Sequence, residues 1–172
     1  IDKAGLDLSS VGRFFVHGST TALNALLERK GVATAYIATR GFRDVPQIGR
    51  LNRPEMYNPK YHKPTPLVAR NLRFDVTERM SARGEVITPL DEDDVRRVAE
   101  ELVRRDIRAV AVCFLHAYKN PRHEQRAKEL LRQFAPHLSV TISSEVAPEQ
   151  REYERSTTTI LNAYLSPIVE RS

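Results

Sequence analysis

The chain has a single cysteine and no long apolar segment, and both absences limit what it can be. Cys113 cannot form an internal disulfide, and such sparse cysteine usage is typical of the reducing cytoplasm. No apolar run approaches the roughly 20 residues that cross a membrane as a helix. No secretory signal peptide is recognisable either. We therefore expect a cytoplasmic protein without a membrane-spanning segment.

Several common chemical motifs are also missing from the sequence. No Ser-His-Asp triad and no Walker-type phosphate loop can be assembled from its residues. The five histidines do not show a metal-ligand spacing, and no cysteine cluster supports a zinc site. The sequence therefore predicts no metal site.

The charge balance is mildly basic but carries no nucleic-acid signature. The chain has 27 Lys and Arg against 22 Asp and Glu, a net charge of +5. Basic and acidic residues alternate instead of forming one basic stripe, and no nucleic-acid motif accompanies them. With 172 residues, 41% of them hydrophobic, the chain is long enough for one sizeable soluble domain. We expect no nucleic-acid partner.

The first third of the chain reads as strand, helix and strand, over residues 14–16, 20–30 and 32–39. The helix presents one apolar face, and Gly31 is expected to end it. This order predicts a right-handed crossover in a parallel sheet. Ligands of such sheets bind beyond the carboxyl ends of the strands, so the loops at 17–18 and 40–43 should share a rim. The expected core face of the helix comprises Ala22, Leu23, Leu26 and Leu27.

Residues 46–66 contain five prolines, which excludes long regular elements and favours an ordered functional loop or a linker. Beyond this Pro-rich segment, residues 72–80 and 86–88 are expected to form strands around a turn at 82–85. The surrounding ion pairs are expected to join Arg70, Arg73 and Arg79 to Asp75, Glu78 and Glu85.

The last part of the chain predicts a second α/β unit. Asp91 is expected to cap a helix whose N3 residue is Asp94. The nearly continuous apolar run 107–115 is typical of a strand covered on both faces, with Cys113 as a small core residue. The remaining expectations are a helix from Pro121, a strand at 140–143 and a helical region at 149–169 interrupted near Pro167. The expected core faces of the first two helices are Val95, Val98, Ala99, Leu102 and Val103, and Ala127, Leu130, Leu131 and Phe134.

The stretch from His17 to Thr21 is the first candidate site. Residues Gly18, Ser19 and Thr20 complete a turn of small, mostly hydroxylated residues that opens a helix. Unpaired N–H groups at a helix start favour an anion such as phosphate or carboxylate. The alternative is that Ser19 or Thr20 simply caps the helix.

Three further regions are candidates. Arg43 follows a predicted strand, and Arg50, Asn52 and Arg53 belong to the Pro-rich segment, where contacts with a partner and simple solvation are both open. His116 stands at the end of the long buried strand as a functional residue or a hydrogen-bonded loop residue. Glu152 and Arg155 belong to a charged stretch that is either an exposed helix start or part of a binding surface.

Short sequence blocks carry a more specific signal, because they run in one order along almost the whole chain. They are His17–Thr20, Asn24–Gly31, Thr39–Val45, Ile48–Pro54, Pro89–Asp91, Val110–Tyr118, Asn120–Pro121, Glu145–Val146, Arg151–Arg155 and Asn162–Leu165. The chain thereby resembles the N-terminal domain of the hydantoinase A/oxoprolinase family. That family includes N-methylhydantoinases, 5-oxoprolinases and subunits of acetone and acetophenone carboxylases.

The resemblance implies an α/β fold with a parallel or mixed sheet and flanking helices, forming part of one lobe of an actin-like, sugar-kinase-like ATPase. Family members begin with a strand and a Gly-rich phosphate loop, and nothing of that kind precedes Phe14. We therefore expect a fragment of a larger protein. Its expected regions are 1–45, the end of the nucleotide-binding lobe; 46–90, a Pro-rich loop and hairpin; and 91–172, a second α/β unit.

By the same resemblance, the parent protein would be an ATP-dependent hydrolase of cyclic amides such as hydantoin or 5-oxoproline. It would use Mg²⁺ and phosphorylate the carbonyl, and it would form an oligomer with a hydantoinase B-like subunit or fused domain. The residues that we expect to bind nucleotide or substrate are His17, Gly18, Ser19, Thr20, Thr21, Arg43, Arg50, Asn52, Arg53, His116, Glu152 and Arg155. The alternative role is a subunit-docking module of a hydantoinase-type or ketone carboxylase complex. A sugar kinase is disfavoured by the specific blocks.

Overall fold

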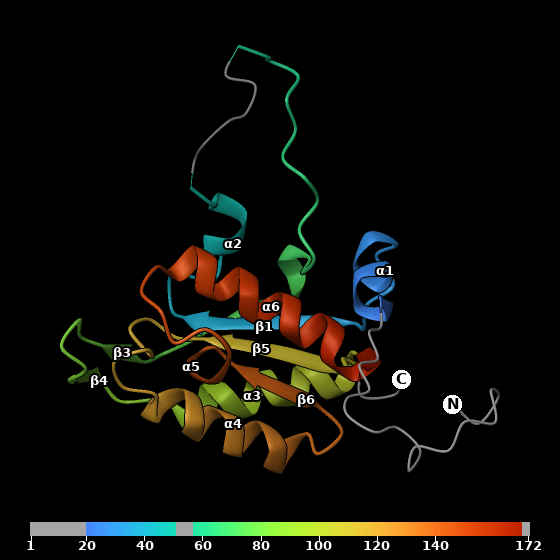
Figure 1. Cartoon of the computed structure of the whole chain (residues 1–172). Coiled ribbons are helices and arrows are strands. Elements are labelled where there is room, and N and C mark those ends of the chain that lie inside the picture. Colours follow the sequence, from blue (N-terminus) through green and yellow to red (C-terminus); the bar gives the residue numbers. More distant parts are fainter. Residues whose placement is uncertain (1–19, 51–56, 170–172) are drawn as a thin grey trace, which may run out of the picture.

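The computed structural model describes residues 20–50 and 57–169, and it is an α/β structure built on a four-stranded parallel sheet (Figure 1). The sheet has the strand order β2-β1-β5-β6, and a separate hairpin pairs β3 with β4. This confirms the predicted class of a parallel sheet with flanking helices. In chain order the elements are α1 (Thr21–Leu27), β1 (Thr34–Thr39), α2 (Val45–Ile48), η3 (Arg70–Leu72), β2 (Arg73–Val76), β3 (Arg79–Met80), β4 (Val86–Thr88), α3 (Glu92–Arg104), β5 (Ala109–Cys113), α4 (Arg122–Phe134), β6 (Ser139–Ile142), α5 (Ser143–Val146) and α6 (Glu152–Val169).

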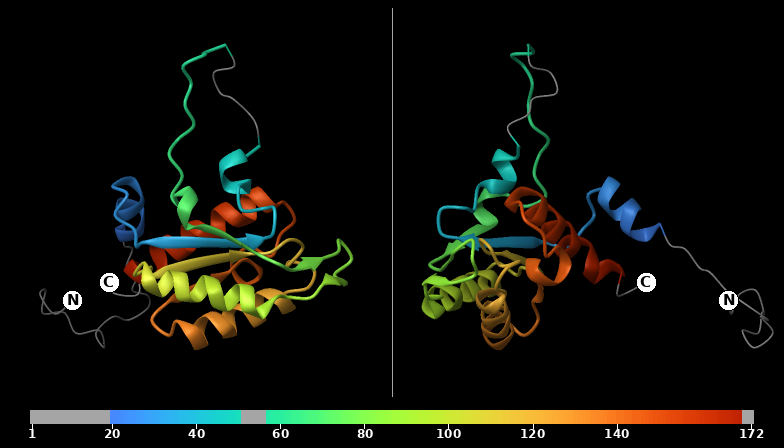
Figure 2. Two further views of the ribbon diagram at one scale, coloured as in Figure 1. Left: turned by 180° about the vertical axis from the view of Figure 1, so that it is seen from behind. Right: turned by 60° about the vertical axis from the view of Figure 1, so that its left-hand side comes forward.

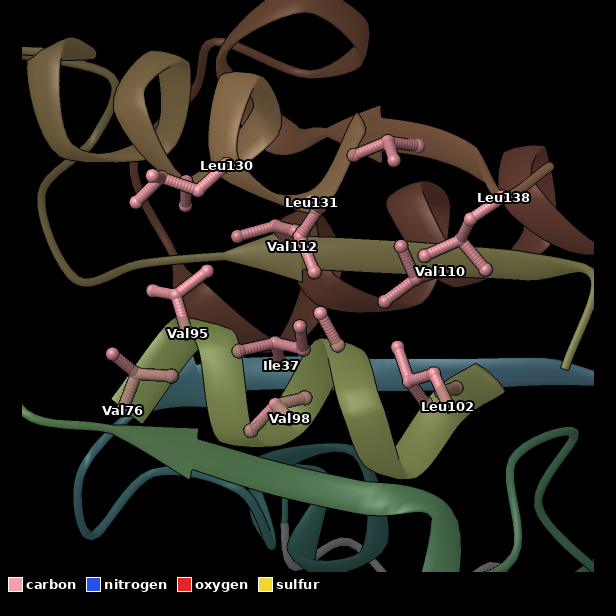
Figure 3. Packing of buried hydrophobic residues seen from close by; sticks show 14 of the residues in the cluster. Ile37, Val76, Val95, Val98, Leu102, Val110, Val112, Leu130, Leu131 and Leu138 are labelled. Atoms are coloured by element: carbon pink, nitrogen blue, oxygen red, sulfur yellow. The ribbon is translucent and has the colours of Figure 1, made fainter. Parts of the chain in front are cut away.

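Helices cover both faces of the sheet, with α3 and α4 on one side and α6 on the other (Figure 2). Alternate strand residues face each layer. Ile37 and Val112 join the core with α3 and α4, where Leu102 is fully buried (Figure 3). Tyr36 and Ala111 face the other way and pack with Ile160 of α6 and its neighbours. Because both faces are covered, every residue of β1 and β5 is buried, as the apolar run 107–115 predicted.

The strand order creates a switch point between β1 and β5. These central strands pair in parallel, from Thr34 with Ala109 to Ala38 with Cys113. After β1 the chain continues to β2 on one side, and after β5 it continues to β6 on the other. The two connections thus leave the carboxyl ends of neighbouring strands in opposite directions. In parallel sheets this arrangement opens a crevice, and ligands bind there.

The start of α3 agrees with the sequence pattern. The Asp91 carboxylate accepts a hydrogen bond from the Asp94 N–H at 3.0 Å, which confirms the predicted cap. The predicted core faces of α3 and α4 were each wrong at one residue. Val103 and Phe134 were expected in the core, but they are 44% and 38% exposed. Each is in the last turn of its helix, where the sheet no longer covers the edge of the apolar stripe.

Helix α1 differs most from expectation. It ends at Leu27 and not at Gly31, and Leu23 and Leu27 are exposed although they were expected in the core. The reason is that α1 contacts α6 beyond the start of β1 instead of lying on the sheet (Figure 1). Gly31 serves this packing, because a Cβ there would lie 2.0 Å from the ring of Tyr164. The predicted strand 14–16 lies outside the described residues.

The segment 72–80 was expected to be one strand but divides between two sheets. Its first half is β2 in the main sheet, and its second half is β3, which pairs with β4 around the predicted turn. The predicted ion pairs were wrong. Arg70 and Arg73 lie 3.8 and 3.5 Å from Asp44, because the loop after β1 runs beside β2. Arg79 instead lies over the ring of Phe42.

The other elements follow the predicted order with shifted ends. Residues 46–66 contain no long regular element among those described, only the end of the short helix α2. Ser143 begins the short helix α5 instead of ending β6. Helix α6 begins at Glu152 and continues through Pro167, so of the expected break or kink near that residue the break does not occur. Within residues 20–50 and 57–169, no helix has both the length and the apolar character needed to cross a membrane.

The two core layers lead to a stability prediction. Leu102→Ala removes a fully buried side chain between α3 and the sheet, so we expect a loss of about 2–5 kcal/mol in the free energy of unfolding. Leu27→Ala is the matched control, since that helical leucine is 72% exposed, and its cost should stay below about 0.5 kcal/mol. Urea denaturation measures both. Equal losses would contradict the layer assignment.

Candidate functional site at the carboxyl ends of β1 and β5

The backbone of Phe114, directly after β5, is held from both faces of the sheet. Its N–H donates to Glu124 Oε1 at 2.8 Å, and its carbonyl oxygen accepts from Arg155 Nη2 at 2.6 Å. Glu124 comes from α4 and Arg155 from α6, so the backbone of one residue joins the two helical layers. Both charged side chains are buried, at 0% and 1% exposure. The acidic and basic partners therefore fix where β5 ends.

Glu124 also fixes the end of β6. Its carboxylate accepts hydrogen bonds from the Ser143 hydroxyl at 2.6 Å and from the Ser144 N–H at 2.8 Å. Burial raises the pKa of Glu124, while the hydrogen bonds from Ser143, Phe114 and Ser144 oppose that rise. The sequence reasoning missed this residue. An acidic residue three positions before Ala127, on the apolar face of α4, was the available signal.

A second buried chain of hydrogen bonds closes the ends of β1 and β5. The Thr39 hydroxyl donates to Glu78 and accepts from the Leu115 N–H at 2.8 Å. The other oxygen of Glu78 lies 2.8 Å from His123 Nδ1. This chain connects β1, the segment between β2 and β3, the end of β5 and the start of α4. None of its side chains was predicted as a site residue.

Three predicted site residues come together beside these clusters. His116 follows β5 with a left-handed backbone, φ 58°, and its ring meets the edge of Tyr118 with 6.0 Å between centroids. The guanidinium carbon of Arg155 lies 5.3 Å from the centre of the same ring. Glu152 Oε1 is 4.0 Å from Arg155 Nη2, a long ion pair. The geometry therefore unites His116, Glu152 and Arg155, and their roles stay predictions.

Two buried nitrogen atoms in this group have no hydrogen-bond partner among the described residues. They are His116 Nδ1 and Arg155 Nη1. Buried polar atoms are almost always paired with protein, water or ligand. The guanidinium can therefore donate further hydrogen bonds, and the imidazole can donate or accept according to its tautomer. Within the described part of the chain, no group of His, Cys, Asp and Glu side chains could hold a metal ion.

The other predicted site residues are spread out. Arg50 forms an ion pair with Glu154 and shares a shallow hollow with Glu152, whereas Arg43 is an exposed residue of the loop after β1. Thr20 precedes α1 and is exposed, and its hydroxyl makes no capping bond to the α1 backbone. His17, Gly18, Ser19, Asn52 and Arg53 lie outside the described residues.

The predicted common rim of the loops 17–18 and 40–43 stays a prediction, because residues 17–18 lie outside the described residues. Thr21 is the first residue of α1, and α1 lies beyond the start of β1 (Figure 1). The loop at 40–43 follows the end of that strand. Thr21 and this loop are therefore separated by the length of β1.

A cavity of about 300 Å³ lies between α2, the second half of the Pro-rich segment and α6. Its lining is mainly apolar, and Lys63 at its edge donates to the carbonyl oxygens of Gln47 and Ile48 at 3.2 and 2.7 Å. Arg50 at the same edge is paired with Glu154. Since both cations are engaged, the cavity suits an apolar group better than an ion. The lining includes Pro46, Tyr61, Pro66, Val68, Tyr153 and Ile160.

Comparison with known proteins decides the family. The family model of the hydantoinase/oxoprolinase N-terminal region matches residues 3–135 of the chain. The chain belongs to this family. The resemblance inferred from the sequence blocks is thereby confirmed, and the family match includes β1, β5 and the β1–β5 switch point.

Individual relatives extend the match beyond α4. The chain is 38% identical to caprolactamase subunit alpha of Pseudomonas jessenii over 159 residues, covering 91% of the chain and 23% of that protein. The solved structure of the ATP-dependent caprolactamase from the same organism superposes with a TM-score of 0.84 and 35% sequence identity. This match covers 95% of the present chain and 25% of the caprolactamase chain. The solved structure of nucleotide-free acetone carboxylase superposes with a TM-score of 0.81 and 29% sequence identity. This match covers 88% of the present chain and 23% of the acetone carboxylase chain. The chain thus spans about a quarter of the length of these relatives.

The buried carboxyl group gives a pH-dependent prediction. The pKa of Glu124 is raised in the folded protein above its ordinary value of 4.5. The stability that its protonated form contributes is therefore complete below pH 4.5 and is lost as the pH rises through the folded pKa. Glu124→Gln should lower the free energy of unfolding by about 1–3 kcal/mol, because the amide N–H₂ of the glutamine would face another hydrogen-bond donor. The cost should be largest in acid and shrink as the pH rises.

Chemical denaturation between pH 4 and pH 8 measures this difference. Glu129→Gln is the control on the same helix, where the carboxylate is exposed and pairs with Arg126. Its cost should be within about 0.5 kcal/mol. A cost of Glu124→Gln that is independent of pH, or that grows as the pH rises, would contradict the raised pKa.

Proposed function

We propose that this chain is part of an ATP-dependent enzyme that hydrolyses cyclic amides of the hydantoin or 5-oxoproline type. The observation that carries the proposal is its likeness to the ATP-dependent caprolactamase, at 35% identity and a TM-score of 0.84 over 95% of the chain. The family description, which names hydantoinase and oxoprolinase, supports the same chemistry. ATP and Mg²⁺ would be the cofactors of the complete protein.

Amide resonance explains why such a reaction uses ATP. A lactam carbonyl is a weak electrophile, and transfer of the γ-phosphoryl group to its oxygen turns that oxygen into part of a leaving group. This transfer releases ADP. A first water then adds to the carbon and the ring C–N bond breaks with the amine as the leaving group, which leaves an acyl phosphate. A second water hydrolyses the acyl phosphate to the carboxylate and inorganic phosphate. Phosphoryl transfer depends on donors and Mg²⁺ positioned around the phosphates. The chain contributes donors near the β1–β5 switch point, but it has no recognisable phosphate loop.

The regions of the chain take distinct parts in this proposal. Residues 1–45 would end the nucleotide-binding lobe of an actin-like ATPase, and residues 91–172 would be the second α/β unit, whose β5 and β6 continue the same sheet as β1. Residues 46–90 would be the Pro-rich loop and hairpin, and they also supply the edge strand β2. The nucleotide- or substrate-binding candidates brought together by the fold are His116, Glu152 and Arg155. We place the complete protein in the cytoplasm as an oligomer.

Two other assignments have a specific observation in their favour. The likeness to acetone carboxylase, with a TM-score of 0.81, supports a ketone carboxylation in which bicarbonate replaces water. The subunit name of the caprolactamase relative supports a docking role toward a second, hydantoinase B-like subunit or domain. The mainly apolar cavity below the Pro-rich segment is the surface that this role would use.

Phosphate release tests the catalytic proposal. The complete protein, co-expressed with its partner subunit, receives ATP and Mg²⁺ with 5-oxoproline, hydantoin, caprolactam, or acetone plus bicarbonate. We expect one cyclic amide to stimulate phosphate release at least tenfold over ATP alone, a gain of about 1.4 kcal/mol in barrier lowering. The isolated chain should release none. Stimulation by acetone and bicarbonate alone would replace cyclic amide hydrolysis by carboxylation.

A charge placed in the cavity tests the docking role. Ile48 is 48% exposed at the cavity, so Ile48→Asp should weaken a partner that inserts an apolar group there by about tenfold or more. Val103→Asp is the control, because Val103 is 44% exposed on α3, on the opposite face of the sheet. Co-elution and the dissociation constant of the complex are the measurements. Equal binding by both variants would exclude the cavity as the docking surface.

A further inference from the structure

Basic groups gather around the ring of Tyr118, beyond the carboxyl end of β5. The guanidinium of Arg155 lies 5.3 Å from the ring centre, and the ammonium of Lys119 lies 5.8 Å from it. His116 meets the ring edge. We call His116, Tyr118, Lys119 and Arg155 the Tyr118 cluster. The cluster lies beyond the carboxyl end of β5, on the β5 side of the β1–β5 switch point.

The charge of Arg155 is incompletely matched within the fold. Its Nη2 donates to the Phe114 carbonyl at 2.6 Å, and its Nε lies 3.4 Å from the sulfur of Cys113. Its nearest carboxylate, that of Glu152, is 4.0 Å away, beyond hydrogen-bond range. Nη1 has no hydrogen-bond partner among residues 20–50 and 57–169, although the side chain is 1% exposed. A buried guanidinium normally forms close, paired bonds to an oxyanion.

His116 adds a second, independent sign of a ligand. Its Nδ1 is also buried without a hydrogen-bond partner in the described part of the chain, and its backbone is in the left-handed region at φ 58°. A residue with a side chain is held in that region at some cost, and such residues concentrate at binding sites. The fold thus holds two unsatisfied nitrogen atoms beside the same aromatic ring.

We propose that the Tyr118 cluster binds a small oxyanion, a phosphate or carboxylate group, between Arg155 and His116. Arg155 Nη1 donates to the anion, His116 donates through Nδ1–H, and Lys119 adds positive charge at the surface. Glu152, whose side chain is one-third exposed and lies 4.0 Å from the guanidinium, moves outward when the anion enters. These contacts support the anion site, and the site does not depend on the proposed reaction with ATP.

Glu152 provides the sharpest variant, because the anion and the Glu152 carboxylate compete for the same guanidinium. Glu152→Gln removes the competing charge, so affinity should rise about threefold or more. Glu154→Gln is the matched control in the same turn of α6. Its carboxylate pairs with Arg50 and not with Arg155, so its effect should stay within about twofold.

His116→Gly tests the other side of the site. Glycine accepts the left-handed backbone, so the variant keeps the fold while the imidazole is lost. Affinity should fall about tenfold, the value of one hydrogen bond to a charged group. Arg155 itself is left unchanged, because its guanidinium also holds the Phe114 carbonyl.

Isothermal titration calorimetry of the purified chain with inorganic phosphate and with acetate measures the binding. No ATP or amide is present, so a failure of the proposed reaction does not affect the result. Saturable binding of phosphate alone identifies a phosphate site, acetate alone a carboxylate site, and both an unselective oxyanion site. Each supports the proposal when Glu152→Gln binds more tightly and His116→Gly more weakly. Absence of saturable binding, or equal affinities in all variants, overturns it.

Discussion

The backbone of Phe114 is the point on which both helical layers depend. Glu124 of α4 accepts its N–H, and Arg155 of α6 donates to its carbonyl oxygen. A buried carboxylate and a buried guanidinium are costly to desolvate, and each needs hydrogen-bond partners to be tolerated. The end of β5 supplies them through its backbone. The first residue after a central strand thereby sets the position of helices on opposite faces of the sheet.

This arrangement makes the carboxyl edge of the sheet rigid over most of its width. Glu124 also binds the start of α5, while Thr39, Glu78 and His123 link β1 to β5 and α4. Each of these groups has a partner, and satisfied polar networks of this kind specify one packing of the core. The loop that carries His116 and Tyr118 begins at this fixed edge. Its backbone is therefore held in place from the first residue after the strand.

Local signals in the sequence predicted much of the fold. The Asp91 cap of α3 and the apolar run of β5 both depend on residues a few positions apart, and both were found. The polar edge depends on distant residues. Arg155 meets Phe114 across 41 positions and Glu78 meets His123 across 45, so no spacing in the sequence indicates these contacts. His116 and Arg155 were recognised as candidates, but through the strand end and the family blocks.

The failures of prediction have a physical reason of the same kind. Helix periodicity gives the apolar face of α1 but not the element that covers it, and α6 takes the place that the sheet was expected to fill. The charge pattern around residues 70–85 suggested local ion pairs, yet parallel pairing of β1 and β2 brings Asp44 to Arg70 and Arg73 instead. Local rules fail where a long-range strand pairing supplies a nearer partner.

The contrast between satisfied and unsatisfied groups separates structure from function at this edge. An unpaired buried donor costs about 1–3 kcal/mol, comparable to the effect of a typical destabilising mutation. Thr39, Glu78, His123 and Glu124 avoid that cost through internal bonds, so their positions are explained by the fold alone. Arg155 Nη1 and His116 Nδ1 do not avoid it. Folding gives no reason to keep these two nitrogen atoms unpaired, whereas recognition of an anion beside Tyr118 does.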